Sequence, residues 1–285
     1  MSSATLLAVC SGNKMMKINC QLVTRVLTSF IREESNKAGF ERNIIGVSGG
    51  LDSTVCAYLA ARAVGPQNIF GLIMPFKDYD QEGVQLAEEC CRLLGINFEK
   101  IDLSPQIEAY FSRHPVELPV LRGNKMARER MSILYDYSAR LKAMILGTSN
   151  KSELLIGYGT IHGDLACGIN PMGDLYKTQV RQLARYLEVP EKIISRKPTA
   201  GLWPGQTDED EIGLSYEELD EILFKLVDER LTPDEAIKAG LEEKKVRQVS
   251  ELIRKSEYKR KMPPIAKLSE RTVGQDFLYP YDWGK

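Results

Sequence analysis

The sequence predicts a doubly wound α/β fold, in which a mostly parallel sheet is flanked by helices and followed by a helical C-terminal extension. Segments of strand character alternate with segments of helical period, as in successive βαβ units. The first strand runs directly into a glycine-rich turn. The Gly/Pro/acid-rich stretch 201–215, which we expect to be a loop, leads into short helices. Since 285 residues can bury a large core, we expect one domain over 1–285, with the extension starting at about residue 212.

The expected sheet consists of short apolar runs at 43–47, 68–74, 96–103 and 143–147. Helices are expected at about 21–37, 51–64, 81–94 and 124–142. The segment 81–94 has its apolar residues close to an amphipathic period and is followed by Gly95, a residue type that often ends helices. In the extension we expect short helices at 215–229, 232–240 and 242–259. Thr232 is the expected N-cap of the second of these, with Pro233 at its first helical position.

Charge and cysteine content narrow the class of protein. The 38 Lys and Arg residues nearly balance the 39 Asp and Glu residues, and the formal net charge of −1 provides no field that would attract nucleic acid or an anionic membrane. The six cysteines include no C-x-x-C pair, which argues against a zinc site and favours reduced thiols. The apolar run at 4–9 lacks a basic flank and is too short to span a bilayer. We therefore expect a cytoplasmic protein with no nucleic-acid or membrane partner.

The loop after the first strand is the strongest functional signal. Its residues are Gly46, Val47, Ser48, Gly49, Gly50, Leu51, Asp52 and Ser53. A strand, a glycine-rich turn and a helix start place several backbone N–H groups at the carboxyl edge of the sheet, which favours a phosphate there. Asp52 would repel a bare phosphate, so a divalent cation between the two is expected. The alternative is a capped helix start with Ser48 or Asp52 as the N-cap. The chain contains no Walker A motif.

The string SGGLDS resembles the pyrophosphate loop of the ATP pyrophosphatase superfamily, whose fold is adenine nucleotide alpha-hydrolase-like. Four further stretches, at 123–139, 146–160, 173–187 and 197–220, occur in the order and approximate spacing found in NAD synthetases. The resemblance covers residues 18–261. It implies an ATP- and Mg²⁺-dependent ligase that adenylates the nicotinate carboxylate of deamido-NAD. Ammonia then displaces AMP, which yields NAD, AMP and pyrophosphate.

The resemblance also assigns roles around ATP. The loop 46–53 would hold the ATP phosphates, and Asp52 and Glu153 would bind Mg²⁺. Further ATP contacts are assigned to Thr148, Lys177 and Thr199. Glu153 lies at a helix start just after a strand end, so its carboxylate can face Asp52 across the carboxyl edge of the sheet. Alternatively it serves only the helix dipole. Lys177 would stabilise charge on the departing pyrophosphate, although without its motif it would be read as a solvated helix residue.

By the same resemblance, deamido-NAD would be bound by Arg128, Arg130, Asp164, Tyr258 and Lys259. Arg128 takes the aligned position, and Arg130 is the weaker candidate because helical residues two apart lie about 200° around the axis. Asp164 would assist ammonia, either by orienting it or by accepting its proton. Lys259 would recognise phosphate or ribose. Tyr258 stands where the family often has a histidine, and it cannot become cationic near neutral pH.

The stretch around Asp164 departs from the family pattern. Ile161 and Gly168 replace a lysine and an acid of ammonia-dependent enzymes, which brings this stretch closer to the glutamine-dependent branch. We therefore transfer no side-chain contacts with the dinucleotide to these two positions. His162 occupies a slot that is usually aromatic, which favours a packing role over general-base catalysis. The acidic stretch 205–211 is either a lid that orders with magnesium and substrate or a mobile exposed loop.

Free ammonia is the expected nitrogen donor. Only about 45 residues precede the loop, too few for the glutaminase domain of glutamine-dependent relatives, although a separate subunit could supply ammonia. The resemblance further implies a homodimer, in which helices from either end of the chain pack across the two-fold axis and both subunits contribute to the dinucleotide site.

Two other functions share the loop. A tRNA-thiolating or lysidine-forming enzyme would favour a basic surface and often paired cysteines, which this chain lacks. A non-catalytic nucleotide-binding module would not need Asp52, Glu153 and Lys177 together.

Overall fold

A four-stranded parallel sheet in the order β3-β2-β1-β4 forms the centre of the molecule. The structure is a computed structural model that describes residues 16–203 and 205–278. The strands are β1 (Arg42–Gly46), β2 (Ile69–Ile73), β3 (Asn97–Lys100) and β4 (Ala143–Leu146). Ile44 of β1 pairs with Phe70 of β2 on one side and with Ile145 of β4 on the other, so β1 is an inner strand. The doubly wound parallel α/β fold predicted from the sequence is confirmed.

Helices make up most of the remaining chain. Those of the first part are α1 (Cys20–Lys37), α2 (Leu51–Val64), α3 (Gln81–Leu94), α4 (Ser104–Phe111), α5 (Pro119–Leu141) and α6 (Lys151–Ile156). They are followed by α7 (Lys177–Tyr186), α8 (Glu191–Ile194), α9 (Asp208–Ile212), α10 (Tyr216–Leu223), α11 (Pro233–Lys238) and α12 (Glu243–Lys255). Single turns are the 3₁₀ helices η2 (Pro66–Asn68) and η4 (Glu257–Arg260) and the π-helix η3 (Phe224–Asp228).

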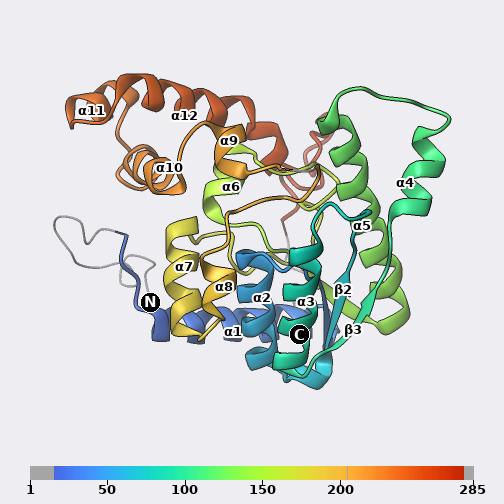
Figure 1. Ribbon diagram of the computed structural model, residues 1–285. Coiled ribbons are helices and arrows are strands. Elements are labelled where there is room, and N and C mark those ends of the chain that lie inside the picture. The colour runs from blue at the N-terminus through green and yellow to red at the C-terminus, as the bar shows by residue number, and fades with distance from the viewer. Residues whose placement is uncertain (1–15, 204, 279–285) are drawn as a thin grey trace.

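The two faces of the sheet are covered by different helices (Figure 1). Ile45 and Ile73 point into a core formed with α1, α2, α3, α7 and α8. Ile44 and Leu72, one residue away along the same strands, point into a second core formed with α4 and α5. This alternation is the period-two pattern of a sheet buried on both faces. It explains why successive residues are apolar at 44–45 in β1 and at 69–73 in β2.

The C-terminal helices form a third apolar cluster beside the sheet and the helices that cover its two faces, which together we call the sheet sandwich. Residues of α10, α11 and α12 pack there with Ile156 of α6 and Tyr176 just before α7. Figure 1 shows α10, α11 and α12 together at one end of the molecule, above α7 and next to α6 and α9. The extension therefore rests on the two helices that follow β4.

Several predicted elements have the bounds that the sequence indicated. The helices predicted at 51–64 and 81–94 are α2 and α3, and α3 ends at Gly95 in the left-handed conformation. Thr232 is the N-cap of α11, with Pro233 at its first position. The helix predicted from about residue 124 begins earlier, at Pro119, because proline suits the first turn of a helix.

Parts of the chain fall outside the predicted elements or outside the described structure. The helix α9 lies inside the stretch 201–215 that was predicted to be a loop. The run at 4–9 and Cys10 lie outside the described residues, while the five described cysteines carry free thiols. Within 16–203 and 205–278, no helix combines the length and apolarity needed to cross a bilayer.

Candidate active site

A cavity of about 500 Å³ opens at the carboxyl edge of the sheet. The helices α2 and α3, which connect β1 to β2 and β2 to β3, lie on one face of the sheet, whereas α5, which leads into β4, lies on the other. Because α2, which follows β1, and α5, which precedes β4, lie on opposite faces, a crevice remains between these two neighbouring strands. Most predicted site residues line this cavity: Gly46, Val47, Ser48, Gly50, Leu51, Asp52, Ser53, Arg130, Thr148, Glu153, Asp164, Lys177, Thr199 and Lys259. Gly49, Arg128 and Tyr258 do not line it.

The loop 46–53 leaves the N-terminus of α2 open to the cavity. The N-cap is Gly50, which has no side chain to satisfy the first backbone N–H groups of the helix. The hydroxyl of Ser53 instead stabilises the loop, accepting from the N–H of Ser48 at 3.2 Å and lying 3.0 Å from Ser48 Oγ. The alternative interpretation, a helix start capped by Ser48 or Asp52, is therefore wrong. The open helix start is suited to a phosphate.

Gly49 allows the backbone of this loop to lie directly against α3. Its φ of +76° is in the left-handed region, where a side chain is strained. A Cβ at this position would overlap the carbonyl oxygen of Gly83 and lie 2.8 Å from its carbonyl carbon. Gly49 thus fixes the shape of the loop, while its neighbour Gly50 faces the cavity.

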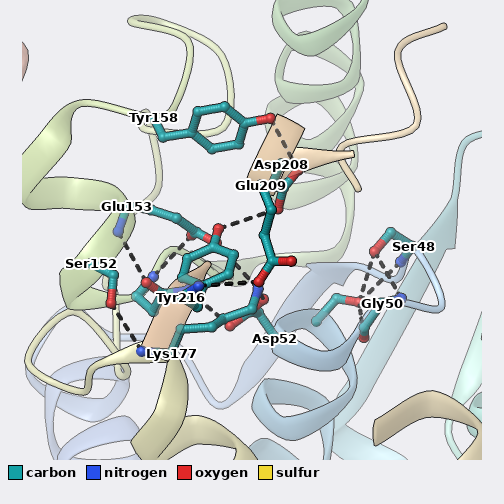
Figure 2. A network of polar contacts seen from close by, with 12 residues as sticks. Ser48, Gly50, Asp52, Ser152, Glu153, Tyr158, Lys177, Asp208, Glu209 and Tyr216 are labelled. Atoms are coloured by element: carbon teal, nitrogen blue, oxygen red, sulfur yellow. Dashed lines mark hydrogen bonds and ion pairs between the residues drawn. The ribbon is translucent and has the colours of Figure 1, made fainter. Parts of the chain in front are cut away.

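Lys177, the first residue of α7, joins two carboxylates at the cavity wall (Figure 2). Only 3% of its side chain is exposed, and its Nζ donates to Asp52 and lies 3.4 Å from Glu153 Oε1. Burial alone lowers the pKa of Lys177, but the carboxylates of Asp52, Glu153 and Asp208 outweigh it and raise this pKa above its usual value. Lys177 is therefore a charged, buried group and not a solvated one. Glu153 faces Asp52 across it, as the sequence predicts.

Asn150 holds both carboxylates in place. It is fully buried, and its Nδ2 donates to Asp52 Oδ1 at 3.1 Å. It is also the N-cap of α6, where its Oδ1 accepts from the N–H of Glu153 at 3.0 Å and its own N–H donates to Glu153 Oε2 at 3.2 Å. This capping box therefore fixes the side chain of Glu153 as well as the helix start.

Two tyrosines and Asp208 complete this side of the cavity (Figure 2). The ring of Tyr216 lies over Lys177, whose Nζ is 4.9 Å from the ring centroid. The hydroxyl of Tyr216 is 3.2 Å from Asp208 Oδ2, and that of Tyr158 donates to Asp208 Oδ1 at 3.0 Å. Burial and the neighbouring carboxylates raise the pKa of both tyrosines. Both phenols thus remain protonated donors that hold Asp208 in the cluster.

The cluster has an excess of negative charge that suits a divalent cation. Burial and mutual repulsion raise the pKa of Glu153 and Asp208 above their usual values, although Lys177 opposes this. Asp52 and Glu153 converge on one ammonium group, so two carboxylates already surround a cation position. Within the described residues no group of three or more His, Cys, Asp or Glu side chains could hold a metal by itself. Mg²⁺ typically takes one or two carboxylates and completes its shell with phosphate oxygens and water, so this pair fits Mg²⁺ beside a nucleotide.

Arg130 and Asp164 face another part of the cavity. Arg130 donates through Nε to the carbonyl of Met74 at 3.1 Å, and Asp164 Oδ1 accepts from the N–H of Thr160 at 2.9 Å. Surrounding protein raises the pKa of Asp164, while hydrogen bonds and the nearby charges of Lys259 and Arg130 oppose this effect. Asp164 is therefore a carboxyl group that can hold a proton more readily than a solvated aspartate.

Lys259 contributes to the cavity and also anchors η4. Its Nζ donates to the carbonyls of Gly157 and Gly159 at 2.8 Å each. Tyr258, the preceding residue, is 60% exposed and lines a neighbouring, smaller pocket together with Lys259. Lys259 therefore borders both pockets, whereas Tyr258 borders only the smaller one.

Arg128 and His162 lie on the surface beside the cavity. Arg128 is exposed and donates through Nε to the carbonyl of Ile161 at 3.1 Å. His162 is exposed and has a φ of +60°, so the predicted packing role is wrong. Arg128 and Arg130 thus point to different surroundings, as their helical spacing indicates.

Two threonines and the acidic stretch 205–211 also lie at the cavity. Thr148 lies two residues after the end of β4, and Thr199 Oγ1 accepts from the N–H of Gly201 at 3.1 Å. Thr207 caps α9 within the stretch 205–211, and this short helix directs Asp208 into the cavity.

Sequence reasoning missed several residues of the cluster. Asn150 could have been found, because Asn150 and Glu153 form the Asx-x-x-Glu pattern of a capping box. Tyr158, Asp208 and Tyr216 carry no such local signal. Tyr158 and Asp208 are 50 residues apart, and Tyr216 and Asp208 meet across the turn between α9 and α10, so the fold brings the three together.

A family model described as NAD synthase matches residues 23–263. The chain belongs to the NAD synthase family. It is 44% identical over 270 residues to the NH(3)-dependent NAD(+) synthetase of Trichlorobacter lovleyi, which covers 95% of this chain and 99% of the relative. Membership of the NAD synthase family makes the chain a ligase and decides against the tRNA-modifying and non-catalytic alternatives.

Two solved structures of similar proteins share the fold. The NMN synthetase of Francisella tularensis is 32% identical with a TM-score of 0.79. The NH3-dependent NAD synthetase of Campylobacter jejuni, in complex with the nitrate ion, is 34% identical with a TM-score of 0.76. Each match covers 88% of this chain and 100% of the other.

Proposed function

We propose that the protein is an ammonia-dependent NAD synthetase that converts deamido-NAD, ATP and ammonia into NAD, AMP and pyrophosphate. The observation that carries the proposal is the cluster of Asp52, Lys177 and Glu153 beside the open helix start after β1. In a chain of the NAD synthase family, this arrangement is suited to holding the phosphates of ATP.

In the first step, a nicotinate carboxylate oxygen attacks the α-phosphorus of ATP. A new P–O bond forms, the bond from that phosphorus to the bridging oxygen breaks, and pyrophosphate leaves. The N–H groups of the loop 46–53 and the ammonium of Lys177 stabilise the charge that develops on the departing oxygens. Asp52 and Glu153 would hold Mg²⁺, which neutralises phosphate charge when bound. Thr148 and Thr199 line the same cavity and are proposed ATP contacts.

In the second step, ammonia attacks the carbonyl carbon of the adenylated nicotinate. The C–N bond forms, the C–O bond to AMP breaks, and the attacking nitrogen must lose a proton. Asp164 faces the cavity and is the candidate that orients ammonia or accepts this proton. Its raised pKa suits the role of proton acceptor.

The dinucleotide would occupy the part of the cavity near Arg130 and Lys259. Both side chains line it, which makes Arg130 a stronger candidate than its sequence position indicated. Arg128 and Tyr258 remain proposed contacts and lie outside the cavity of a single chain. A homodimer in which both subunits contribute to the dinucleotide site would give them a role. The exposed apolar residues Val26 and Phe30 of α1 support such an interface, and sedimentation equilibrium measures the assembly directly.

The test is to incubate the purified protein with ATP, Mg²⁺ and deamido-NAD, with either ammonium or glutamine, and to follow NAD, AMP and pyrophosphate. We expect NAD with ammonium alone. A parallel reaction contains nicotinate mononucleotide in place of deamido-NAD, because one solved relative is called an NMN synthetase. A faster reaction with the mononucleotide would overturn the proposed substrate, and the absence of AMP from every reaction would overturn the proposed chemistry.

A further inference from the structure

We propose that Asp220 of α10 is a positioning residue: it fixes the starts of α6 and α7 so that Glu153 and Lys177 converge on Asp52. This inference rests on the function proposed above for that cluster. It connects the helical extension to the chemistry, because α10 belongs to the third apolar cluster and not to the sheet sandwich.

The contacts of Asp220 reach the beginnings of both helices. One carboxylate oxygen accepts from the hydroxyl of Ser152, and Oδ2 accepts from the backbone N–H of Thr178 at 2.9 Å. Ser152 Oγ in turn accepts from the backbone N–H of Lys177 at 3.0 Å. Asp220 is 1% exposed and Ser152 is fully buried, so these bonds are shielded from water.

The two residues that Asp220 contacts directly are each one residue away from Glu153 or Lys177. Ser152 precedes Glu153 in the first turn of α6, and Thr178 follows Lys177 in the first turn of α7. A displacement of either helix start therefore moves the carboxylate of Glu153 or the ammonium of Lys177 relative to Asp52. One carboxylate on α10 controls both distances.

Apolar packing alone does not account for a carboxylate at this position. Burial raises the pKa of Asp220, its hydrogen bonds from Ser152 and Thr178 lower it, and the neighbouring Glu217 raises it again. The pKa of Asp220 is raised overall, so the hydrogen bonds and the N-terminus of α7 offset only part of the cost of burying this carboxylate. A leucine would pack among Leu219, Ile222 and Leu223 without the cost of burying a charge. It could not accept from the first N–H groups of α7, which have no acceptor within their own helix.

Asp228 provides a matched control in the same region. Its carboxylate accepts from the hydroxyl of Tyr176 and, at 3.0 Å, from Nζ of Lys151. These two residues directly precede Lys177 and Ser152, yet Asp228 contacts only their side chains and not a backbone group. Asp228→Asn therefore perturbs the same two helix starts without releasing the N–H groups of Lys177 or Thr178. Leu219→Ala, on α10 itself, controls for a destabilised extension.

The test compares Asp220→Ala, Asp220→Asn, Asp228→Asn and Leu219→Ala at a temperature where circular dichroism shows all four to be folded. We expect Asp220→Ala to lower kcat by roughly tenfold to a hundredfold, the cost of misplacing catalytic groups by about 1 Å. The KM for deamido-NAD should stay near that of the wild type, because the displaced groups act on ATP. Asp220→Asn should recover most of the activity, since its amide oxygen still accepts from Thr178 and its amide N–H can donate to Ser152 Oγ.

Calorimetric titration with ATP and Mg²⁺ gives a readout that needs no turnover. We expect weaker ATP binding in Asp220→Ala and wild-type binding in Asp228→Asn and Leu219→Ala. If Asp220→Ala does not fold, the comparison uses Ser152→Ala in its place. That variant removes the hydroxyl oxygen that accepts from the N–H of Lys177. Equal losses in Asp220→Ala and Leu219→Ala would reduce Asp220 to a structural role and overturn the inference. An inactive wild type with this binding pattern intact would instead overturn the proposed substrate and leave the positioning role standing.

Discussion

Alanine substitution should have different effects at the two adjacent glycines of the loop 46–53: a loss of stability at Gly49 and a loss of ATP affinity at Gly50. Gly49→Ala places a methyl group at a φ of +76°, which costs about 1–2 kcal/mol for a residue with a side chain. The same methyl overlaps the carbonyl oxygen of Gly83 and lies 3.0 Å from the backbone nitrogen of Ala87. Both are backbone atoms of α3 and cannot rotate away, so overpacking adds about 1–3 kcal/mol. The expected loss of unfolding free energy is about 2–5 kcal/mol.

Gly50→Ala is the matched control. Gly50 has a φ of −83°, which any residue adopts, and its methyl group would meet only Ser48 Oγ at 3.3 Å, a side chain that can rotate. Alanine also reduces the entropy of the unfolded chain, which favours folding by about 0.4–1 kcal/mol. We expect stability within about 1 kcal/mol of the wild type. Because Gly50 faces the cavity at the helix start, the methyl group should nevertheless weaken ATP binding.

Urea denaturation and thermal melting measure the first effect, and calorimetric titration with ATP measures the second. The unfolding entropy of 285 residues is about 0.6 kcal/mol/K, so Gly49→Ala should lower the melting midpoint by about 3–8 °C. The urea midpoint should fall without a change in slope. Equal midpoints for the two variants would refute the argument from close approach to α3. Unchanged ATP affinity in Gly50→Ala would refute the placement of phosphate at the start of α2.

Four further results are expected. Asp52→Asn should leave the circular dichroism spectrum intact and cripple Mg²⁺-dependent turnover, and wild-type turnover would contradict the metal assignment. Asp164→Asn should slow amide formation while AMP transfer to the carboxylate persists, as measured by pyrophosphate release in a single turnover; equal loss of both steps would indicate a binding role. Thr232→Ala removes the capping box of α11 and should cost about 1 kcal/mol in urea denaturation, whereas an unchanged midpoint would show that the cap does not limit stability. Burial raises the pKa of Cys90 to about 11 and of Cys91 to about 12. At pH 8 both thiols should therefore stay protonated and react slowly with a disulfide reagent, and the reaction should become faster as the pH rises and be fastest in urea. Rapid labelling of either residue in the folded protein, located by peptide mapping, would contradict this.

Local sequence patterns were sufficient to predict the sheet and its flanking helices, because residues at the ends of these elements mark where the elements begin and end. Asp80 caps the start of α3 through the N–H of Gly83, and Gly95 ends the helix in the left-handed conformation. The inner strands carry apolar residues on both faces, Ile44 and Ile45 in β1 and the run 69–73 in β2, because both faces of the sheet are buried. Helix α9 was missed because a helix of five residues, four of them acidic, has the composition of a loop. Thr207 was the available signal, since it caps this helix.

The candidate site was predictable where a motif gave a residue type and a position on an element. Asp52 and Glu153 both follow a strand end, so parallel strands had to bring them to the same edge. The burial of Lys177 was not predictable from its helix, because its carboxylate partners lie 125 and 24 residues away. Asp220 has even less local signal. Ser215 and Glu218 form a capping box at the start of α10, and this pattern accounts for the helix without identifying a role for Asp220.

The position of Asp220 along the chain also has a consequence during synthesis. Translation at about 5–20 residues per second completes Asp220 roughly 10–30 s after Asp52. During that interval the nascent chain already contains the loop 46–53, while the residue that aligns Lys177 has not been made. If Asp220 aligns Lys177 as proposed, a chain that has not yet reached α10 contains the loop 46–53 but not the contacts that place the ammonium of Lys177 beside Asp52. Full ATP-cleaving activity would then require that the ribosome has completed the extension.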